Sequence, residues 1–384
     1  MQTSAKTSRQ LQNLHIHFDE IDLHAVTRAF NSTSFSGRSP IIADYEAVIS
    51  AYFGSPHALA CSNGTVAIEL ALRSLELKPG AAVAVPPTAP VMTILPVISL
   101  GLRPVFYDVR PDSFAPDLDD LRSLSAEGIA ALITVPMWGY PWDMEAVAGF
   151  CSSNGIALIE DCAHAFGTEM NGRKFGTFGD IATFSTHERK LVSTGEGGFC
   201  ITPHAHLHER MRTWQHHGAL FDASGAYRVG ERIGSNSKLA PLCAALGISQ
   251  FARLDIKIAS RRAVVARLRE ALKPCKTLVE FNRYPGSEIN GYAMVFWFEG
   301  EDRGRSQLLA ASGIQSDTVR YNYKPLYHAP AFARYARPCP NAEKLIGSII
   351  TLPCHEGLSE NDICEIAAVV EDIYGRDYRR SVAS

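Results

Sequence analysis

The chain has 384 residues and a formal net charge of -3. At about 100–200 residues per domain, this length predicts two or three domains, or one large and one smaller domain. The small net charge gives no bulk attraction to nucleic acid or an anionic membrane, and no apolar stretch reaches the roughly 18 residues of a membrane span. We therefore expect neither partner.

The first residues lack the apolar core of a signal peptide. The nine cysteines include no C-x-x-C pair, so we expect no metal site and no redox motif. An odd cysteine count without a signal peptide fits a reducing compartment. These observations predict a cytoplasmic protein.

The first part of the chain predicts alternating helices and strands. Residues 1–40 are polar and irregular apart from an amphipathic helix at 21–30. The alternation that follows, with continuous apolar strands, indicates an α/β domain with a largely parallel sheet. Apolar spacing predicts helices at 40–52, 66–75, 91–100, 118–124 and 142–154, and strands at 57–61, 82–85, 104–107, 129–135 and 156–159.

The later part of the chain mixes helices with fewer strands. A long helix at 259–272 is expected to lead into a second domain. We predict that residues 1–255 form an N-terminal segment and a large α/β domain, and that 256–384 form a small C-terminal α+β domain. The remaining predicted elements are helices at 205–217, 241–254, 305–312 and 360–374, and a strand at 291–298.

The stretch from residue 179 to residue 198 stands out. A short apolar strand ends at Ser185, Lys190 follows five residues on, and a glycine-dense turn closes the stretch at 195–198. Upstream, the apolar strand at 156–159 runs into Asp161. Ligands of parallel α/β sheets lie beyond the carboxyl ends of the strands. Because Asp161 and Ser185 fall at or just after strand ends, we expect them at one edge of the sheet.

A reactive lysine and a buried aspartate at strand ends are what a pyridoxal 5'-phosphate (PLP) enzyme requires. Lys190 can form the Schiff base and later act as a general base, and Asp161 can partner the pyridine nitrogen. The Gly64-Thr65 turn before a helix, with Ser185, can bind the phosphate through N–H groups and the helix dipole. Taken singly, each residue has a simpler interpretation, as a helix cap or a solvated side chain. Taken together, they favour PLP.

These motifs resemble the nucleotide-sugar and aminocyclitol aminotransferases, the DegT/StrS-type branch of fold-type-I PLP-dependent enzymes. The resemblance runs from about Ser36 to Pro353. It implies a large α/β domain with a mostly parallel central sheet plus a smaller C-terminal α+β domain. Its most specific pieces are Ser62-Asn63-Gly64-Thr65, Ile159-Glu160-Asp161-Cys162-Ala163-His164, and Ser185-x4-Lys190-x4-Gly-Glu-Gly-Gly.

The resemblance implies a role for each matching residue. Lys190 would carry the Schiff base and Asp161 would contact the pyridine nitrogen, while His164 stands where the family commonly has Gln near the cofactor hydroxyl. Asn236 would reach the cofactor phosphate of the neighbouring subunit, which implies a homodimer. The phosphate-binding residues would be Ser185, Gly64 and Thr65.

The chain departs from the family at one place. Pro90 stands where an aromatic residue usually stacks on the PLP ring, so Pro90, Ala89 or another residue would take that contact. The loop before Lys190 is also unusually charged. Arg189 or His187 is a candidate for the amino donor's carboxylate, and a solvated loop is the alternative.

The activity implied by the resemblance is amino transfer. The amine would pass from glutamate or glutamine to a nucleotide-linked keto sugar or to a keto-cyclitol. The reaction would run in ping-pong half-reactions through pyridoxamine phosphate. Family members with His in place of the Schiff-base Lys are sugar 3-dehydratases, and Lys190 argues against that variant. Two alternatives stay open: a PLP-dependent sugar dehydratase or lyase, and a catalytically inactive regulatory protein. Tyr321, Tyr323 and His328 either line the substrate pocket or serve packing.

Overall fold

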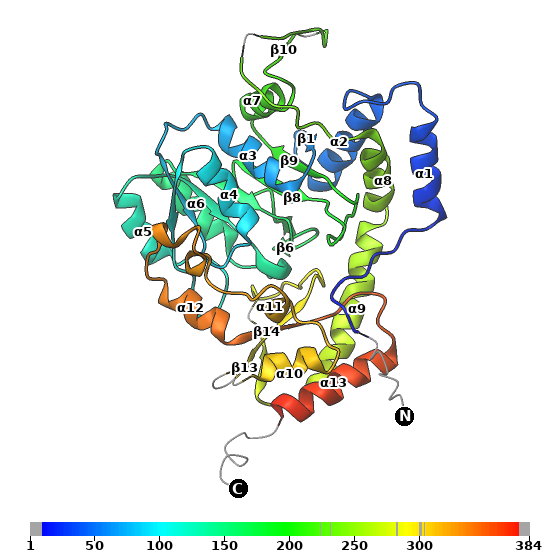
Figure 1. Ribbon diagram of the computed structural model, residues 1–384, viewed down its shortest axis with the longest axis vertical. Coiled ribbons are helices and arrows are strands. Elements are labelled where there is room, and N and C mark those ends of the chain that lie inside the picture. The colour runs from blue at the N-terminus through cyan, green and yellow to red at the C-terminus, as the bar shows by residue number, and fades with distance from the viewer. Residues whose placement is uncertain are drawn as a thin grey trace, which may run out of the picture.

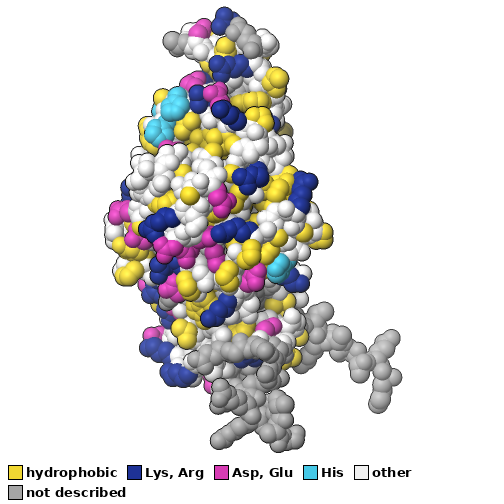
Figure 2. Space-filling model, turned by 90° about the vertical axis from the view of Figure 1, so that its left-hand side faces the viewer, with side chains coloured by type: hydrophobic (Ala, Val, Ile, Leu, Met, Phe, Trp, Pro, Cys, Tyr) yellow, Lys and Arg dark blue, Asp and Glu magenta, His cyan; other side chains and the backbone are white. Residues whose placement is uncertain are grey.

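The computed structural model describes residues 10–222, 224–230, 232–281, 283–298, 302 and 304–375. A large α/β part lies on one side of the molecule and a smaller part with helices and an antiparallel sheet on the other, and the long helix α9 (Leu254–Leu272) runs between them (Figure 1). Every helix among the described residues is too short or too polar to cross a bilayer. On the face drawn in Figure 2, acidic and basic side chains are interspersed.

The large part is built on a seven-stranded sheet. Six strands run in one direction, and only β9 runs against its neighbours β1 and β8. Its strands are almost entirely buried, which explains their continuous apolar sequence. The expected α/β class with a mostly parallel sheet is confirmed. In sheet order the strands are β1 (His57–Cys61), β9 (Gly198–Thr202), β8 (Ile181–Ser185), β5 (Ala157–Asp161), β4 (Ile129–Thr134), β2 (Ala82–Val85) and β3 (Arg103–Phe106).

Helices flank this sheet as the alternating pattern predicts. Helix α3 packs on β8 and β9, α5 on β4, and α6 on β5. Helix α8 lies between α1 and α2, and Figure 1 shows α1 and α8 side by side. The helices of the large part are α1 (Glu20–Phe30), α2 (Pro40–Phe53), α3 (Gly64–Ser74), α4 (Val91–Ser99), α5 (Leu118–Ala126), α6 (Met144–Asn154), α7 (Ala205–Gln215) and α8 (Pro241–Phe251), and a 3-10 turn, η1, spans Met137–Gly139.

The smaller part contains an antiparallel sheet in the order β12-β13-β14. Helix α13 packs against α9 and α10. Two short hairpins, β6–β7 and β10–β11, extend from the large part. These elements are β6 (Glu169–Met170), β7 (Arg173–Lys174), β10 (Leu220–Phe221), β11 (Tyr227–Arg228), β12 (Leu278–Glu280), β13 (Met294–Phe298), β14 (Ile349–Leu352), α10 (Arg305–Ala311), α11 (Asp317–Arg320), η2 (Leu326–His328), η3 (Ala333–Tyr335), α12 (Pro340–Gly347) and α13 (Glu360–Tyr374).

Two chain segments pack across the expected division at residue 255. Near the N-terminus, the Leu11 N–H donates to the Gly313 carbonyl at 2.8 Å, so this segment lies on the smaller part. Near the start of α12, the Asn341 N–H donates to Asp108 at 3.0 Å, on the large part. The division into 1–255 and 256–384 stays a prediction, and both contacts tie the two parts together.

Several element boundaries differ from the predicted ones for identifiable reasons. The helix predicted at 66–75 begins at Gly64, because the Asn63 side chain accepts from the Val66 N–H at 2.9 Å and caps it. The strand predicted at 156–159 continues to Asp161, because Asp161 pairs with Thr183 of β8. Tertiary pairing, which the apolar pattern does not encode, makes Asp161 the last residue of its strand.

Candidate active site

Glycine packing brings the ends of β1 and β8 together. Gly198 of β9 pairs with Cys61 on one side and Ser185 on the other. A Cβ on Gly198 would lie 2.6 Å from the Asn63 carbonyl carbon, so only glycine lets the turn after β1 pass this close. A Cβ on Gly64 would lie 2.6 Å from the Ser185 Cβ. Gly64 and Ser185, predicted separately, therefore meet.

This contact creates a small cradle suited to an anion. Gly64 and Thr65 are the first residues of α3, so their N–H groups have no acceptor inside the helix. The Ser185 hydroxyl accepts from the His187 N–H at 3.3 Å and keeps its own proton for another acceptor. A helix N-terminus with free N–H groups and a hydroxyl favours phosphate.

The loop that carries Lys190 is closed at its base. The Thr186 N–H donates to the Gly197 carbonyl at 2.8 Å, and the Thr194 N–H donates back to the Thr186 carbonyl at 2.8 Å. The two threonine hydroxyls are 2.6 Å apart. Because its ends are fixed in this way, the loop holds Lys190 beside the end of β8.

The Lys190 amine lies in a buried, charged environment. Burial lowers its pKa to about 8, against the charges of Asp161 and Asp317, which favour the protonated form. Its Nζ is 3.5 Å from the hydroxyl of Tyr292. A lysine with this pKa has a larger uncharged fraction near neutral pH than an exposed lysine, which suits a nucleophile and a proton acceptor.

Asp161 is buried at the end of β5. Its Oδ2 accepts from the Thr93 hydroxyl at 2.6 Å, and its Oδ1 accepts from the Ala163 N–H at 3.3 Å. Burial raises the pKa of Asp161, and the two hydrogen bonds and the Lys190 charge oppose this rise. A carboxylate that is held on one side and stabilised by a cation can pair with a protonated ring nitrogen.

His164 follows the same strand and lies against Tyr292. The two rings are 4.2 Å apart and nearly parallel, at 23°. The His164 Nδ1 accepts from the Trp138 N–H at 3.3 Å, and burial holds its pKa well below the usual range. The imidazole is therefore neutral, with its hydrogen on Nε2, and can donate to a cofactor oxygen.

Several residues around Lys190 were not predicted as site residues. Tyr292 is fixed by Asn290, whose Oδ1 accepts from the Tyr292 N–H at 2.9 Å and whose Nδ2 donates to the His164 carbonyl at 2.7 Å. For Arg189, the sequence leaves open whether it meets the donor's carboxylate or lies in a solvated loop. Its side chain is in fact only 14% exposed and lies beside Asp317.

Other predicted residues lie apart from this group. Asn236 is exposed and accepts from the Lys238 Nζ, and no contact in the described residues joins it to Lys190 or Asp161. Its role across a subunit interface stays a prediction. His328 is also exposed. Tyr321 is the exception, because it is 55% exposed but its ring is 5.6 Å from the guanidinium carbon of Arg189.

An aromatic residue from far along the chain contacts the segment that contains Pro90. Pro90 caps the start of α4. The Tyr323 hydroxyl donates to the Thr88 carbonyl at 2.6 Å, and its ring meets Trp138 edge-on at 5.2 Å. Tyr323 thus belongs to the walls around the site. That Pro90, Ala89 or another residue stacks on the cofactor ring stays a prediction.

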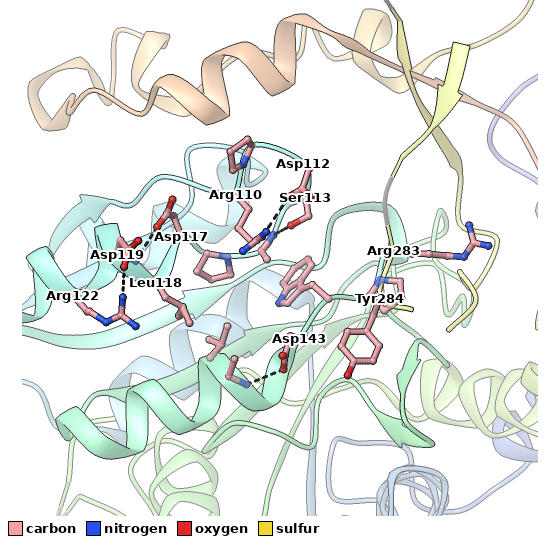
Figure 3. Close-up of a pocket in the computed structure, with 17 residues that line it drawn as sticks. Arg110, Asp112, Ser113, Asp117, Leu118, Asp119, Arg122, Asp143, Arg283 and Tyr284 are labelled. Atoms are coloured by element: carbon pink, nitrogen blue, oxygen red, sulfur yellow. Dashed lines mark hydrogen bonds and ion pairs between the residues drawn. The ribbon is translucent and has the colours of Figure 1, made fainter. Parts of the chain in front are cut away.

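A cavity of about 500 Å³ opens elsewhere on the same edge of the sheet (Figure 3). It lies over the loops that follow β3 and β4, and Trp142 and Tyr284 form part of its wall. Its charged side chains include Arg110 and Asp112, which form an ion pair at 3.4 Å. The cavity contains none of the predicted site residues, so the site is defined by the contacts around Lys190.

Comparison with known proteins decides the family. The model of the DegT/DnrJ/EryC1/StrS aminotransferase family matches residues 17–371. The chain belongs to this family. The predicted resemblance is confirmed, and the protein is a PLP-dependent aminotransferase.

Individual relatives agree over nearly the whole chain. The aminotransferase is 30% identical to GDP-perosamine synthase of Caulobacter vibrioides, over 91% of this chain and 94% of that one. It is 31% identical to a UDP-N-acetyl-3-dehydro-alpha-D-glucosamine 3-aminotransferase of Acidithiobacillus ferrooxidans, over 95% and 97%. A solved DegT/DnrJ/EryC1/StrS aminotransferase from Brucella abortus superimposes with a TM-score of 0.84 at 28% identity, over 93% and 96%.

The residues present fit PLP. The cradle that a Cβ on Gly64 would fill would hold its phosphate, and Asp161 and Lys190 would meet its ring nitrogen and its aldehyde. When bound, PLP supplies an electron sink for the carbanion that amino transfer requires. The chain supplies a buried amine, a buried carboxylate and a neutral imidazole around it.

Proposed function

We propose that this aminotransferase moves an amino group from glutamate or glutamine to a keto sugar carried on a nucleotide, or to a keto-cyclitol. The observation that carries the proposal is the Lys190 amine. Its pKa is lowered to about 8, it interacts electrostatically with Asp161, and it lies at the same sheet edge as the Gly64–Ser185 cradle. This is the group of side chains that amino transfer on PLP needs.

Each residue has one task in this proposal. Lys190 anchors the cofactor, and its freed amine takes a proton from the donor's α-carbon and returns it during transfer. Asp161 keeps the ring nitrogen protonated, and His164 donates to the ring oxygen. Gly64, Thr65 and Ser185 bind the phosphate, which fixes the position of the ring.

The relatives support a nucleotide-linked sugar as acceptor. Their names specify a GDP-linked product in one case and a UDP-linked keto sugar in the other. We further propose a homodimer in which Asn236 reaches the neighbouring cofactor phosphate. All nine cysteines are free thiols, which supports a place in the cytoplasm.

The proposal is tested with purified, PLP-loaded protein. Borohydride reduction and peptide mapping should place the pyridoxyl group on Lys190. Glutamate or glutamine should then convert the bound cofactor to pyridoxamine phosphate and release the matching keto acid. A panel of nucleotide-linked keto sugars, read by mass spectrometry, should regenerate PLP and yield an amino sugar. A sugar dehydratase would instead release water from the sugar without forming keto acid, and that result would refute amino transfer.

The role of Asn236 has its own test, by mixing subunits. The variants Lys190→Ala and Asn236→Ala are expected to be weakly active alone. If Asn236 acts across the interface, equal mixing restores about a quarter of the sites, because half of the dimers are mixed and each has one intact site. If Asn236 acts within its own subunit, mixing restores none.

A further inference from the structure

Arg189, the residue before Lys190, is a buried cation that is only partly paired. Its Nη2 lies 3.5 Å from the Asp317 Oδ1, an ion pair without a hydrogen bond. Its Nη1 is buried, and no described residue accepts a hydrogen bond from it. The ring of Tyr321 is 5.6 Å from the guanidinium carbon. A guanidinium has five N–H donors, so this one keeps donors for a ligand.

Asp317 is held in place from its other side. Its Oδ2 accepts from the Trp138 Nε1 at 3.3 Å, and its side chain is 7% exposed. Asp317 therefore offsets the charge of the buried guanidinium while leaving part of it free. An arginine–carboxylate pair with only a structural role would be expected to form two short parallel hydrogen bonds, as such pairs commonly do.

The Arg189 guanidinium is within electrostatic reach of the reacting amine. The Arg189 charge lowers the pKa of both Lys190 and His164. It acts in the same way on Tyr292, whose hydroxyl is 3.5 Å from the Lys190 Nζ. The guanidinium is thus an anion-binding group within electrostatic reach of the atoms that exchange the amino group.

The chemistry of the two substrates decides which anion fits this place. In an amino acid, the α-carboxylate is one bond from the carbon that carries the amine. In a nucleotide-linked sugar, the diphosphate is separated from a ring keto carbon by bonds of the sugar ring. A cation next to the reacting amine therefore matches the α-carboxylate, and the planar guanidinium suits it in bidentate geometry.

We propose that Arg189 binds the α-carboxylate of the amino donor, with Asp317 as the positioning residue that orients the guanidinium. The proposal rests on the proposed function, since it assumes an amino acid donor. It assigns the donor carboxylate to a residue from the loop that carries Lys190. The donor's carboxylate would thereby be bound by the residue next to Lys190, whose freed amine exchanges the proton of the donor's α-carbon.

The test compares Arg189→Met with Arg189→Lys in the PLP-loaded protein. Rapid-mixing absorbance follows conversion of the cofactor to pyridoxamine phosphate by L-glutamate and, separately, by L-glutamine. Arg189→Met should raise the half-saturating concentration of both donors about 10- to 100-fold, the range for a lost charge-assisted hydrogen bond. Arg189→Lys should recover only part of the loss, because it keeps the charge without the fork.

The matched control is Arg103→Met, which removes an exposed arginine at the opposite, amino-terminal end of β3. It should leave both half-saturating concentrations unchanged. Equal losses for glutamate and glutamine support contact with the α-carboxylate, the group they share. A loss for glutamate alone would move the contact to its side-chain carboxylate, and no loss for either donor would remove Arg189 from the donor site; both results overturn the proposal.

Binding gives a second readout that does not depend on turnover. Isothermal titration of glutarate, a dicarboxylate with no amine or keto group to react, into PLP-loaded protein should show a dissociation constant larger by the same factor for Arg189→Met. Unchanged binding would overturn the proposal, whether or not the wild-type protein converts a donor. Failure of the wild-type protein to convert any donor would count only against the proposed function. If Arg189→Met fails to fold, Arg189→Gln replaces it in both measurements.

Discussion

The hydroxyl of Thr93, in the first turn of α4, donates a 2.6 Å hydrogen bond to the Oδ2 of Asp161 at the end of β5. Thr93 is fully buried, and this bond opposes the rise that burial causes in the pKa of Asp161. The anionic form of the carboxylate predicted to meet the cofactor's ring nitrogen is therefore favoured by a residue from helix α4.

Replacing Thr93 with valine keeps the shape and removes the hydrogen bond. Without it the pKa of Asp161 rises further, so a smaller fraction of Asp161 is anionic at a given pH. We expect PLP affinity to fall about tenfold, the effect of one charge-assisted hydrogen bond, and its pH dependence to move to higher pH. Equilibrium titration with PLP across pH measures both. Thr93→Ser, which keeps the hydroxyl, should behave like the wild type; equal behaviour of Thr93→Val would show that the bond is unimportant.

Glu160 and Asp161 are neighbours on β5 and have different tasks, because successive side chains point to opposite faces of a sheet. Glu160 accepts from the N–H groups of Phe178 and Gly179 at 2.7 Å and of Gly176 at 2.8 Å. In Glu160→Gln an amide NH₂ would face an N–H donor, so we expect a loss of about 1–3 kcal/mol in the free energy of unfolding.

The same pair of variants separates folding from cofactor binding. Glu160→Gln should retain the PLP affinity of the wild type, whereas Asp161→Asn should lose PLP affinity and amino transfer while unfolding at a similar denaturant concentration. Chemical denaturation and PLP titration of both variants check this. A loss of PLP affinity in Glu160→Gln as large as in Asp161→Asn would contradict the assignment.

The parts of the site that lie at strand ends were predictable. Continuous apolar runs marked the strands, and Asp161 and Ser185 follow directly from where those runs stop. The glycines at 197–198 were recognisable as a motif. The physical reason for Gly198 is the close approach of the turn after β1, which follows from the sheet order that places β9 between β1 and β8. The reason for Gly197 is the close approach of the Thr186 and Thr194 hydroxyls.

The residues that surround those strand ends were not predictable. Thr93 and Tyr292 come from other parts of the chain, and nothing in their local sequence marks them. Local sequence could not decide whether Arg189 contacts the donor or lies in a solvated loop, because its partner, Asp317, lies in another domain of the predicted scheme. Side-chain pairs of this kind depend on tertiary packing, so a local pattern carries no information about them.

The lowered pKa of Lys190 predicts a specific pH dependence. Burial disfavours the charged amine and so lowers the pH at which Lys190 loses its proton. The folded protein holds Lys190 protonated below pH about 8 and uncharged above it, whereas an exposed lysine would stay charged to about 10.4. Labelling of the cofactor-free protein with trinitrobenzenesulfonate, read by peptide mass spectrometry, should show Lys190 reacting with a midpoint near 8. Asp161→Asn removes a charge that favours the protonated form, so its midpoint should fall. A midpoint above 10 in the wild type would contradict the buried environment.

Gly64 provides the most direct test of the phosphate cradle. In Gly64→Ala the new Cβ would lie 2.6 Å from the Ser185 Cβ, so α3 and β8 must separate at the cradle. We expect PLP affinity to fall about tenfold or more while the affinity for pyridoxal, which lacks the phosphate, changes little, since a displaced helix N-terminus loses its hydrogen bonds to the anion. Absorbance titrations give the two dissociation constants. The measured quantity is the affinity for PLP divided by the affinity for pyridoxal.

The matched control for Gly64→Ala is Gly149→Ala in α6. A Cβ on Gly149 meets nothing within 4 Å, so this variant should keep the affinity ratio and gain up to about 1 kcal/mol of stability from helix propensity. Thermal unfolding of the cofactor-free proteins measures that gain. If Gly64→Ala and Gly149→Ala show the same ratio as the wild type, the phosphate binds elsewhere. A lower affinity for PLP relative to pyridoxal in Gly64→Ala alone locates the phosphate at the junction of α3 and β8.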